Sequence, residues 1–115
     1  MSKTKAPIKD FYILSGDDWS RQVSWSINSV VVDITGYSVE VNVSALKGQP
    51  TPDLVLSVGS GVTLTDATNG KFSITITDAQ SSALDGVYFY DVRMTSAGGQ
   101  DDTILEGVLN IRGRV

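Results

Sequence analysis

Two pairs of adjacent carboxylates, Asp17-Asp18 and Asp101-Asp102, are the residues of this 115-residue chain best suited to chemistry. Paired carboxylates act as acid and base in glycosidases and as ligands in calcium sites. Neither segment has the regular Asp/Asn spacing of a calcium-binding loop. Asp is also common in turns at strand ends, because its side chain bonds to nearby backbone. We therefore interpret both pairs as turns and keep an Asp-dependent hydrolase as an alternative.

The composition removes most other catalytic and metal-binding chemistry. The chain has no cysteine, and so no disulfide, thiolate ligand or cysteine nucleophile. It also has no histidine, the commonest general base and metal ligand. No G-x-S-x-G turn presents a serine nucleophile, and no helix follows Gly98-Gly99 to bind a phosphate. We predict a protein that is not an enzyme and uses no metal or cofactor.

The charge balance bears on the class of partner. There are 9 Lys and Arg against 13 Asp and Glu, a net charge of −4. Nucleic-acid-binding proteins present a basic face, so we expect no nucleic-acid partner. No apolar run approaches the ~20 residues of a membrane span, and the first residues lack the apolar core of a signal peptide. We expect no membrane partner, and synthesis in the cytoplasm without a signal peptide.

An alternation of apolar and polar residues with period two dominates the chain after residue 10, as between Tyr37 and Ala45. This pattern is typical of strands with one buried face. Residues 78–84 are the one candidate helical turn, with Asp78 as its cap. The sequence therefore predicts an all-β fold, an immunoglobulin-like antiparallel β-sandwich of about eight strands. The expected core residues are Trp19, Val23, Trp25, Val41, Ile74, Tyr88, Tyr90, Leu105 and Leu109.

The Asn-Gly pair at 69–70 marks a hairpin. A two-residue turn there would place Leu64 opposite Thr75, on the wrong face. A three-residue loop over 68–70 instead places Leu64 opposite Ile74. We therefore predict the longer loop, with Gly70 in the left-handed conformation and a bulge beside it.

Residues 1–10 are polar and lysine-bearing, and are expected to form a flexible arm before a single domain over 11–115. Within the domain, Phe89 lies on the face opposite Tyr88 and Tyr90, where an apolar ring is often covered by a partner. Arg21 interrupts an apolar face, and is expected either to pair with Asp91 or Glu106 or to reach water. The predicted partner-binding residues are Lys3, Lys5, Lys9, Phe89 and Arg93.

The segment from Asp78 to Tyr90 is similar to the E–F corner of immunoglobulin-like sandwiches. In that corner a tyrosine hydroxyl bonds back to the backbone a few residues upstream. Tyr88 takes this place here. The acidic residue that usually precedes the tyrosine is replaced by Leu84, with Asp85 one position later.

Five short motifs follow one another along the chain: Gly16-Asp17-Asp18, Asp33-Ile34-Thr35-Gly36, Ile76-Thr77-Asp78-Ala79-Gln80, Leu84 to Val92, and Leu105 to Ile111. Their order and spacing, from about Phe11 to Ile111, resemble a group of small β-sandwich structural proteins of tailed bacteriophages. The chain is similar to the N-terminal domain of the upper baseplate proteins of siphophages. It differs from them because no fibre or receptor-binding segment follows the sandwich before Val115.

The resemblance implies a structural protein located in the virion. It would be a non-catalytic accessory subunit on the tail, baseplate or capsid, bound to other virion proteins and to copies of itself. The arm is expected to reach along a neighbour, and an exposed sheet edge to accept a strand from another chain. An alternative is a carbohydrate-binding module on the virion surface, because exposed aromatic residues on a β-face suit sugars.

Overall fold

The computed structural model describes residues 9–46 and 49–112, and these form an all-β fold. A 3₁₀ turn, η1 (Ala67–Asn69), and one short helix, α1 (Asp78–Ser82), are the helical segments of this part of the chain. The strands are β1 (Phe11–Leu14), β2 (Trp19–Ser24), β3 (Ser26–Ile27), β4 (Val30–Val31), β5 (Ser38–Ser44), β6 (Leu54–Val58), β7 (Gly61–Asp66), β8 (Lys71–Ile76), β9 (Gly86–Thr95) and β10 (Asp101–Arg112).

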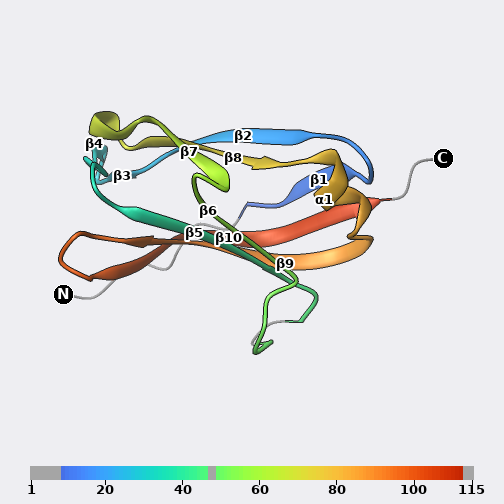
Figure 1. Ribbon diagram of the computed structural model, residues 1–115. Coiled ribbons are helices and arrows are strands. Elements are labelled where there is room, and N and C mark those ends of the chain that lie inside the picture. The colour runs from blue at the N-terminus through green and yellow to red at the C-terminus, as the bar shows by residue number, and fades with distance from the viewer. Residues whose placement is uncertain (1–8, 47–48, 113–115) are drawn as a thin grey trace.

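Eight strands form one continuous sheet in the order β1-β10-β9-β5-β6-β7-β8-β2, and β3 and β4 form a separate pair. The sheet folds over on itself, so that β2 and β8 lie above β5, β9 and β10 in Figure 1. The two halves join at the tight corner between β6 and β7. There Ser57 N donates to Ser60 O at 3.0 Å, and Gly59 N donates to Val62 O at 3.0 Å. The core lies between the halves.

The first strand pairs differently from the expectation. β1 runs parallel to β10, with Phe11 opposite Leu109 and Leu14 opposite Arg112, so the prediction of purely antiparallel pairing is wrong. The turn after β1 leads the chain to the other half of the sheet, where β2 pairs with β8. Consecutive strands β1 and β2 therefore do not form a hairpin, and β1 finds its partner almost a whole chain length away.

The core consists of aliphatic and aromatic side chains from both halves of the sheet. Of the nine expected core residues, Val41, Ile74, Tyr90 and Leu109 are buried. The other five are partly buried and pack against this core: Trp19, Val23, Trp25, Tyr88 and Leu105. Trp19 and Val23 are less buried because β2 is an edge strand, with a neighbour on one side only.

The alternating stretch from Trp19 to Ile27 is not one strand. β2 ends at Ser24, and one further bond in the same register follows, in which Trp25 N donates to Gly70 O at 2.9 Å. The chain then forms the small β3–β4 hairpin, whose turn residues Asn28 and Ser29 have φ of 52° and 67°. Ile27, the last apolar residue of this alternation, is 51% exposed.

The β7–β8 hairpin has the predicted left-handed glycine but not the predicted register. Gly70 has φ of 70°, whereas Leu64 lies opposite Phe72 rather than Ile74. The loop holds four residues rather than three, because η1 forms a 3₁₀ turn there. The bulge lies between Leu64 and Asp66. A two-residue shift keeps each side chain on its face, so the face was predicted correctly and the partner was not.

The helical turn predicted over 78–84 is present as α1, but Asp78 is not its cap. Thr77 is the N-cap: its hydroxyl accepts from Gln80 N at 3.3 Å, and the Gln80 side chain accepts from Thr77 N at 2.9 Å. This reciprocal pair is a capping box. Leu84, expected to tuck under the sheet, is 7% exposed. Next to it, the Tyr88 hydroxyl accepts from Asp85 N at 3.2 Å, which is the back-bond expected for the corner.

We predict that Gly70→Ala lowers the free energy of unfolding by about 1–3 kcal/mol, measured by urea titration. A side chain there would adopt a strained φ, and its Cβ would lie 2.6 Å from the carbonyl oxygens of Trp25 and Val32. The matched control is Gly98→Ala, whose Cβ would approach nothing closer than Ser96 Oγ at 3.9 Å. The control should stay within about 0.5 kcal/mol of the parent. Equal stabilities of the two variants would contradict this account of the hairpin.

Candidate functional site

The Asp17-Asp18 pair forms part of the connection between the β1–β2 turn and α1. Asp18 Oδ1 accepts from Asp78 N at 2.7 Å, at the start of the helix. The hydroxyl of Ser81, which is fully buried, donates to Asp17 O at 2.9 Å and accepts from Gly16 N at 2.9 Å. These contacts agree with the interpretation of this pair as a turn.

The Asp101-Asp102 pair lies at the β9–β10 hairpin. Asp101 Oδ1 accepts from Thr95 Oγ1 at 2.7 Å, and Asp102 Oδ2 accepts from Gln100 Nε2 at 3.5 Å. This hairpin and the β1–β2 turn lie at opposite ends of the molecule (Figure 1), so the two pairs do not share a site. Within the described ranges, no three His, Cys, Asp or Glu side chains gather closely enough to hold a metal ion.

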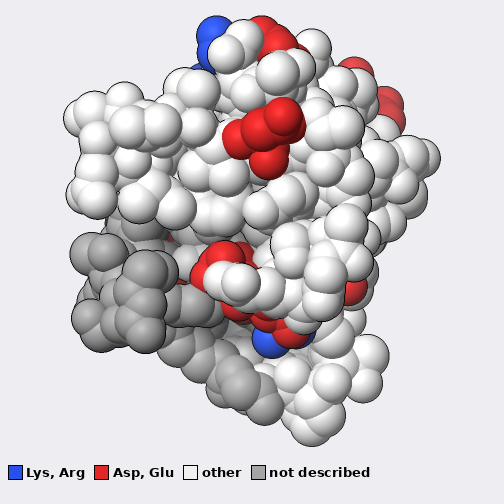
Figure 2. Space-filling view, turned by 90° about the vertical axis from the view of Figure 1, so that its left-hand side faces the viewer, with Lys and Arg blue, Asp and Glu red and all other residues white. Residues whose placement is uncertain are grey.

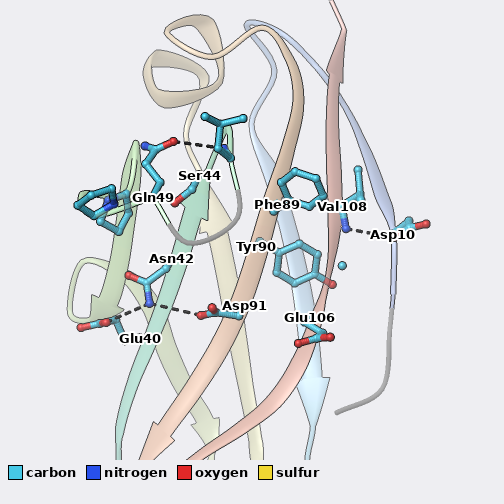
Figure 3. Close-up of a pocket in the computed structure, with 14 residues that line it drawn as sticks. Asp10, Glu40, Asn42, Ser44, Gln49, Phe89, Tyr90, Asp91, Glu106 and Val108 are labelled. Carbon is cyan, nitrogen blue, oxygen red and sulfur yellow. Dashed lines mark hydrogen bonds between the residues drawn. The ribbon is translucent and has the colours of Figure 1, made fainter. Parts of the chain in front are cut away.

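A hollow of about 750 Å³ lies on the outer face of β5, β9 and β10 (Figure 3). The strand register arranges its floor in two rows. One row runs across the strands as Ser44, Phe89 and Val108. The next row consists of Asn42, Asp91 and Glu106. We call this feature the outer hollow.

The loop between β5 and β6 forms one wall of the outer hollow. The side chain of Asp53 closes its base, where Ala45 N donates to Asp53 Oδ2 at 2.8 Å. Gln49 spans the loop: its side-chain oxygen accepts from Leu46 N at 3.2 Å, and its amide nitrogen donates to Thr51 O at 2.7 Å. Hydrogen bonds within the loop therefore hold this wall in place.

The outer hollow is acidic. Four carboxylates line it, whereas none of its described lining residues is Lys or Arg. Asp91 lies directly opposite Glu106 on the neighbouring strand, and like charges in that arrangement are destabilising. Asn42 Nδ2 donates to Asp91 Oδ1 at 3.3 Å and to Glu40 Oε1 at 3.1 Å. Among the described residues, Arg93 also lies opposite Glu40 on the neighbouring strand. The fourth carboxylate belongs to Asp10.

Asp10 is held at the rim of the outer hollow by a set of contacts that we call the anchor. Val108 N donates to Asp10 Oδ1 at 3.1 Å, and Lys9 N donates to Glu106 O at 2.9 Å. The hydroxyl of Tyr90 donates to Lys9 O at 2.5 Å. Burial, and to a lesser degree the negative charge of Asp10, raise the pKa of Tyr90 well above its usual value. Residues 9 and 10 therefore lie against the sheet.

Gly107 makes this close approach possible. A Cβ at this position would overlap the carbonyl group of Lys9 and would lie 3.1 Å from Asp10 Oδ1. The absence of a side chain here explains in physical terms the glycine in the motif from Leu105 to Ile111.

The structure places the predicted partner-binding residues in different situations. Phe89 is half-buried in the floor of the outer hollow, and Arg93 is exposed on the same face, opposite Glu40. Lys9 is exposed beside the hollow, next to Asp10. Lys3 and Lys5 lie outside the described residues.

Arg21 does not take the expected ionic partners. Its guanidinium carbon lies 5.5 Å from the ring centroid of Phe11 and 5.9 Å from that of Trp19, a cation–π arrangement. Asp91 and Glu106 point from the outer face of the other half of the sheet, so pairing with either of them was the wrong prediction. Arg21 is exposed, which agrees with the alternative that its head reaches water.

The acidic character of the outer hollow was not predicted from the sequence. In the alternating strands, the polar positions on the outer face are ordinary places for polar residues, and they hold Glu40, Asn42 and Glu106. Only the lateral order of β5, β9 and β10 brings them together, and the alternation does not encode that order.

All 13 Asp and Glu residues belong to the described part, whereas Lys3, Lys5, Lys47 and Arg114 fall outside it, which leaves five of the nine basic residues. Figure 2 shows red acidic side chains at several places on one end of the molecule and little blue.

A comparison of the sequence with protein-family models finds no match, and a comparison with curated proteins finds no significant relative. Among the described residues, no helix has the length and apolar composition needed to cross a membrane.

We predict that Tyr90→Phe lowers the free energy of unfolding by about 1 kcal/mol at neutral pH, because Lys9 O loses its donor. The raised pKa of Tyr90 adds a pH dependence. An unfolded tyrosine ionises near pH 10, before the folded one. This contribution to stability is therefore present below about pH 10 and is lost as pH rises toward the folded pKa. Urea titrations between about pH 8 and pH 11 measure both effects.

The phenylalanine variant should lose less stability on the alkaline side than the parent, because it lacks this ionisation. Tyr12→Phe is the matched control, since Tyr12 is 71% exposed. Its alkaline slope should equal that of the parent. If Tyr90→Phe and the parent lose stability in parallel up to pH 11, the anchor does not suppress the ionisation of this tyrosine.

Proposed function

We propose that this chain is a structural protein of a tailed bacteriophage particle, a non-catalytic accessory subunit. It attaches to the tail, baseplate or capsid through protein–protein contacts. The observation that carries the proposal is the ordered set of motifs from Gly16 to Ile111, each of which occupies a position with a structural reason. Gly16 and Asp17 bond to Ser81 of α1, and Gly107 leaves room for the anchor.

The finer fold assignment belongs to the same proposal. We take the folded-over sheet as an immunoglobulin-like β-sandwich. Two features support this: the facing halves of the sheet (Figure 1), and the Tyr88 hydroxyl bonded to the backbone of Asp85. The Asp33-Ile34-Thr35-Gly36 motif contributes a local turn. There Asp33 Oδ1 accepts from Thr35 N at 3.0 Å and from Thr35 Oγ1 at 2.6 Å, and these bonds lower the pKa of Asp33.

The proposed mechanism is adhesion and bracing by three parts of the molecule. The outer hollow offers a shaped acidic face, and the segment before the anchor can reach a neighbour. The third part is β1, the terminal strand of the sheet order, with Tyr12 71% and Leu14 49% exposed. An edge strand presents backbone groups that can pair with a strand of another protein.

Deletion of residues 1–8 tests the role of the arm while keeping the anchor. We expect the truncated protein to keep the melting temperature of the parent to within about 2 °C, because it retains the anchor residues Lys9 and Asp10 and the described core. We also expect its loss from purified phage particles, measured by quantitative mass spectrometry of the particle fraction. The control is Lys3→Arg with Lys5→Arg, which preserves charge and should be incorporated normally. Full incorporation of the truncated protein would refute the role of the arm.

Carbohydrate binding remains a second candidate because of one observation. The outer hollow combines an aromatic ring, Phe89, with the amide of Asn42 and the carboxylate of Asp91, a combination that suits sugars. If it binds glycans, the parent should give signals on a glycan array, and Phe89→Ala should lose them. Tyr12→Ala, which removes an exposed ring outside the hollow, should retain them. An array without parent signal counts against this function.

A further inference from the structure

We propose that the outer hollow binds the lysine-bearing residues 1–8 of a second copy of this chain, and so links subunits to one another. The inference rests on the proposed function, because it names the partner to which the arm binds. Four features of the sequence and of the described residues support it: charge, spacing, apolar surface, and the place where the chain leaves the anchor.

Charge is the first feature. Asp91 and Glu106 lie directly opposite each other and are both partly buried, with Glu40 and Asp10 on the same lining. An ammonium group placed between the two carboxylates would remove their mutual repulsion and form charge-assisted hydrogen bonds. No Lys or Arg of the described lining does this. The charge that would complement the hollow is concentrated in the arm, where Lys3 and Lys5 stand within eight residues that contain no acidic residue.

Spacing is the second feature. In an extended strand, residues two apart point to the same side and lie about 6.5–7 Å apart. Lys3 and Lys5 have this spacing. Neighbouring strands of a sheet lie about 4.8 Å apart, so carboxylates on β5, β9 and β10 spread over about 10 Å. Two lysines of one extended segment can therefore meet separate carboxylates of the hollow at the same time.

The third feature is apolar surface beside the charge. The row that contains Phe89 and Val108 borders the acidic row, and Leu46, 68% exposed, and Pro50 belong to the facing wall. The arm continues after its lysines with Ala6-Pro7-Ile8, a short apolar run. A segment that is basic at one end and apolar at the other matches a hollow with one acidic and one apolar row.

The exit point of the chain favours a second copy over the chain's own arm. Lys9 is bonded to Glu106 O along the edge of β10, whereas the hollow opens on the face of the sheet. A continuation of the parallel β1–β10 pairing before Lys9 would run along the edge of β10 rather than across the face on which the hollow opens. Pro7 favours extended backbone at Ala6, which suits such a continuation.

The arm is long enough to reach a neighbour. Eight extended residues span at most about 29 Å, and the shorter dimensions of the molecule are 27 Å and 24 Å. Each copy would donate one arm and accept another. The result is a closed ring if the rotation between copies closes, and an open row if it does not.

The test uses the full chain and its charge-reversal variants, with self-association measured by sedimentation at about 0.05 M and about 0.5 M NaCl. The parent should associate in a concentration-dependent manner at low salt, and much less at high salt. Two variants reverse one side each: Lys3→Glu with Lys5→Glu on the arm, and Glu40→Lys with Glu106→Lys on the hollow. Each variant alone should associate at least about tenfold more weakly than the parent.

Mixing the two variants is the decisive measurement. The acidic arm of one matches the basic hollow of the other, so the mixture should associate although neither variant does so alone. Asp85→Lys is the control, because Asp85 is exposed and lies outside the hollow. It should associate like the parent. A parent that stays monomeric, a mixture that stays monomeric, or variants that behave like the control would each overturn the inference.

Nuclear magnetic resonance separates a second copy from the chain's own arm. Amide shifts of Phe89 and Val108 that differ between the parent and the chain without residues 1–8, and that do not change with concentration, would show that the hollow binds its own arm. That result would also overturn the inference. Particle mass spectrometry tests the proposed function separately. A chain that self-associates as expected but is absent from particles would refute the phage role and leave the self-association standing.

Discussion

The contact on which much of the structure depends is the anchor, where the Tyr90 hydroxyl donates to Lys9 O above the bare Cα of Gly107. This contact fixes which residues of β10 lie beside the N-terminal residues. It thereby sets the parallel register that places Phe11 opposite Leu109. The anchor also holds Asp10 at the rim of the outer hollow through Val108 N, so the same few contacts serve both the core and the outer surface.

The aromatic cluster beneath the anchor ties the edges of the sheet together. The ring of Phe11 lies 5.0 Å from that of Trp19 and 5.8 Å from that of Tyr90, centroid to centroid. Strands β1, β2 and β9 belong to different parts of the sheet order, and these three rings bring them into one contact. The guanidinium of Arg21 covers the exposed side of the cluster. Arg21, which interrupts the apolar pattern of its strand, therefore screens that face from water.

Local rules explain why part of this fold was predictable from the sequence. The alternation in β5 correctly placed Val39, Val41 and Val43 inside, and the Asn-Gly signal correctly gave Gly70 its left-handed conformation. The predictions that failed involve partners distant in sequence or competing local bonds. The β7–β8 register depended on a 3₁₀ turn that added a residue to the loop. The outer hollow depended on Asp91 and Glu106 meeting across strands, which their own alternation does not specify.

The parallel pairing of β1 with β10 has a consequence for the order of events during synthesis. Residues 11–14 emerge from the ribosome early, yet the residues they pair with are 109–112. Pairings between such distant segments close late and slow the folding reaction. Until β10 has been synthesised, Phe11 and Ile13 have no paired strand beside them, and the nascent chain exposes an unpaired strand. The domain can therefore complete its fold only after residues 109–112 have left the ribosome.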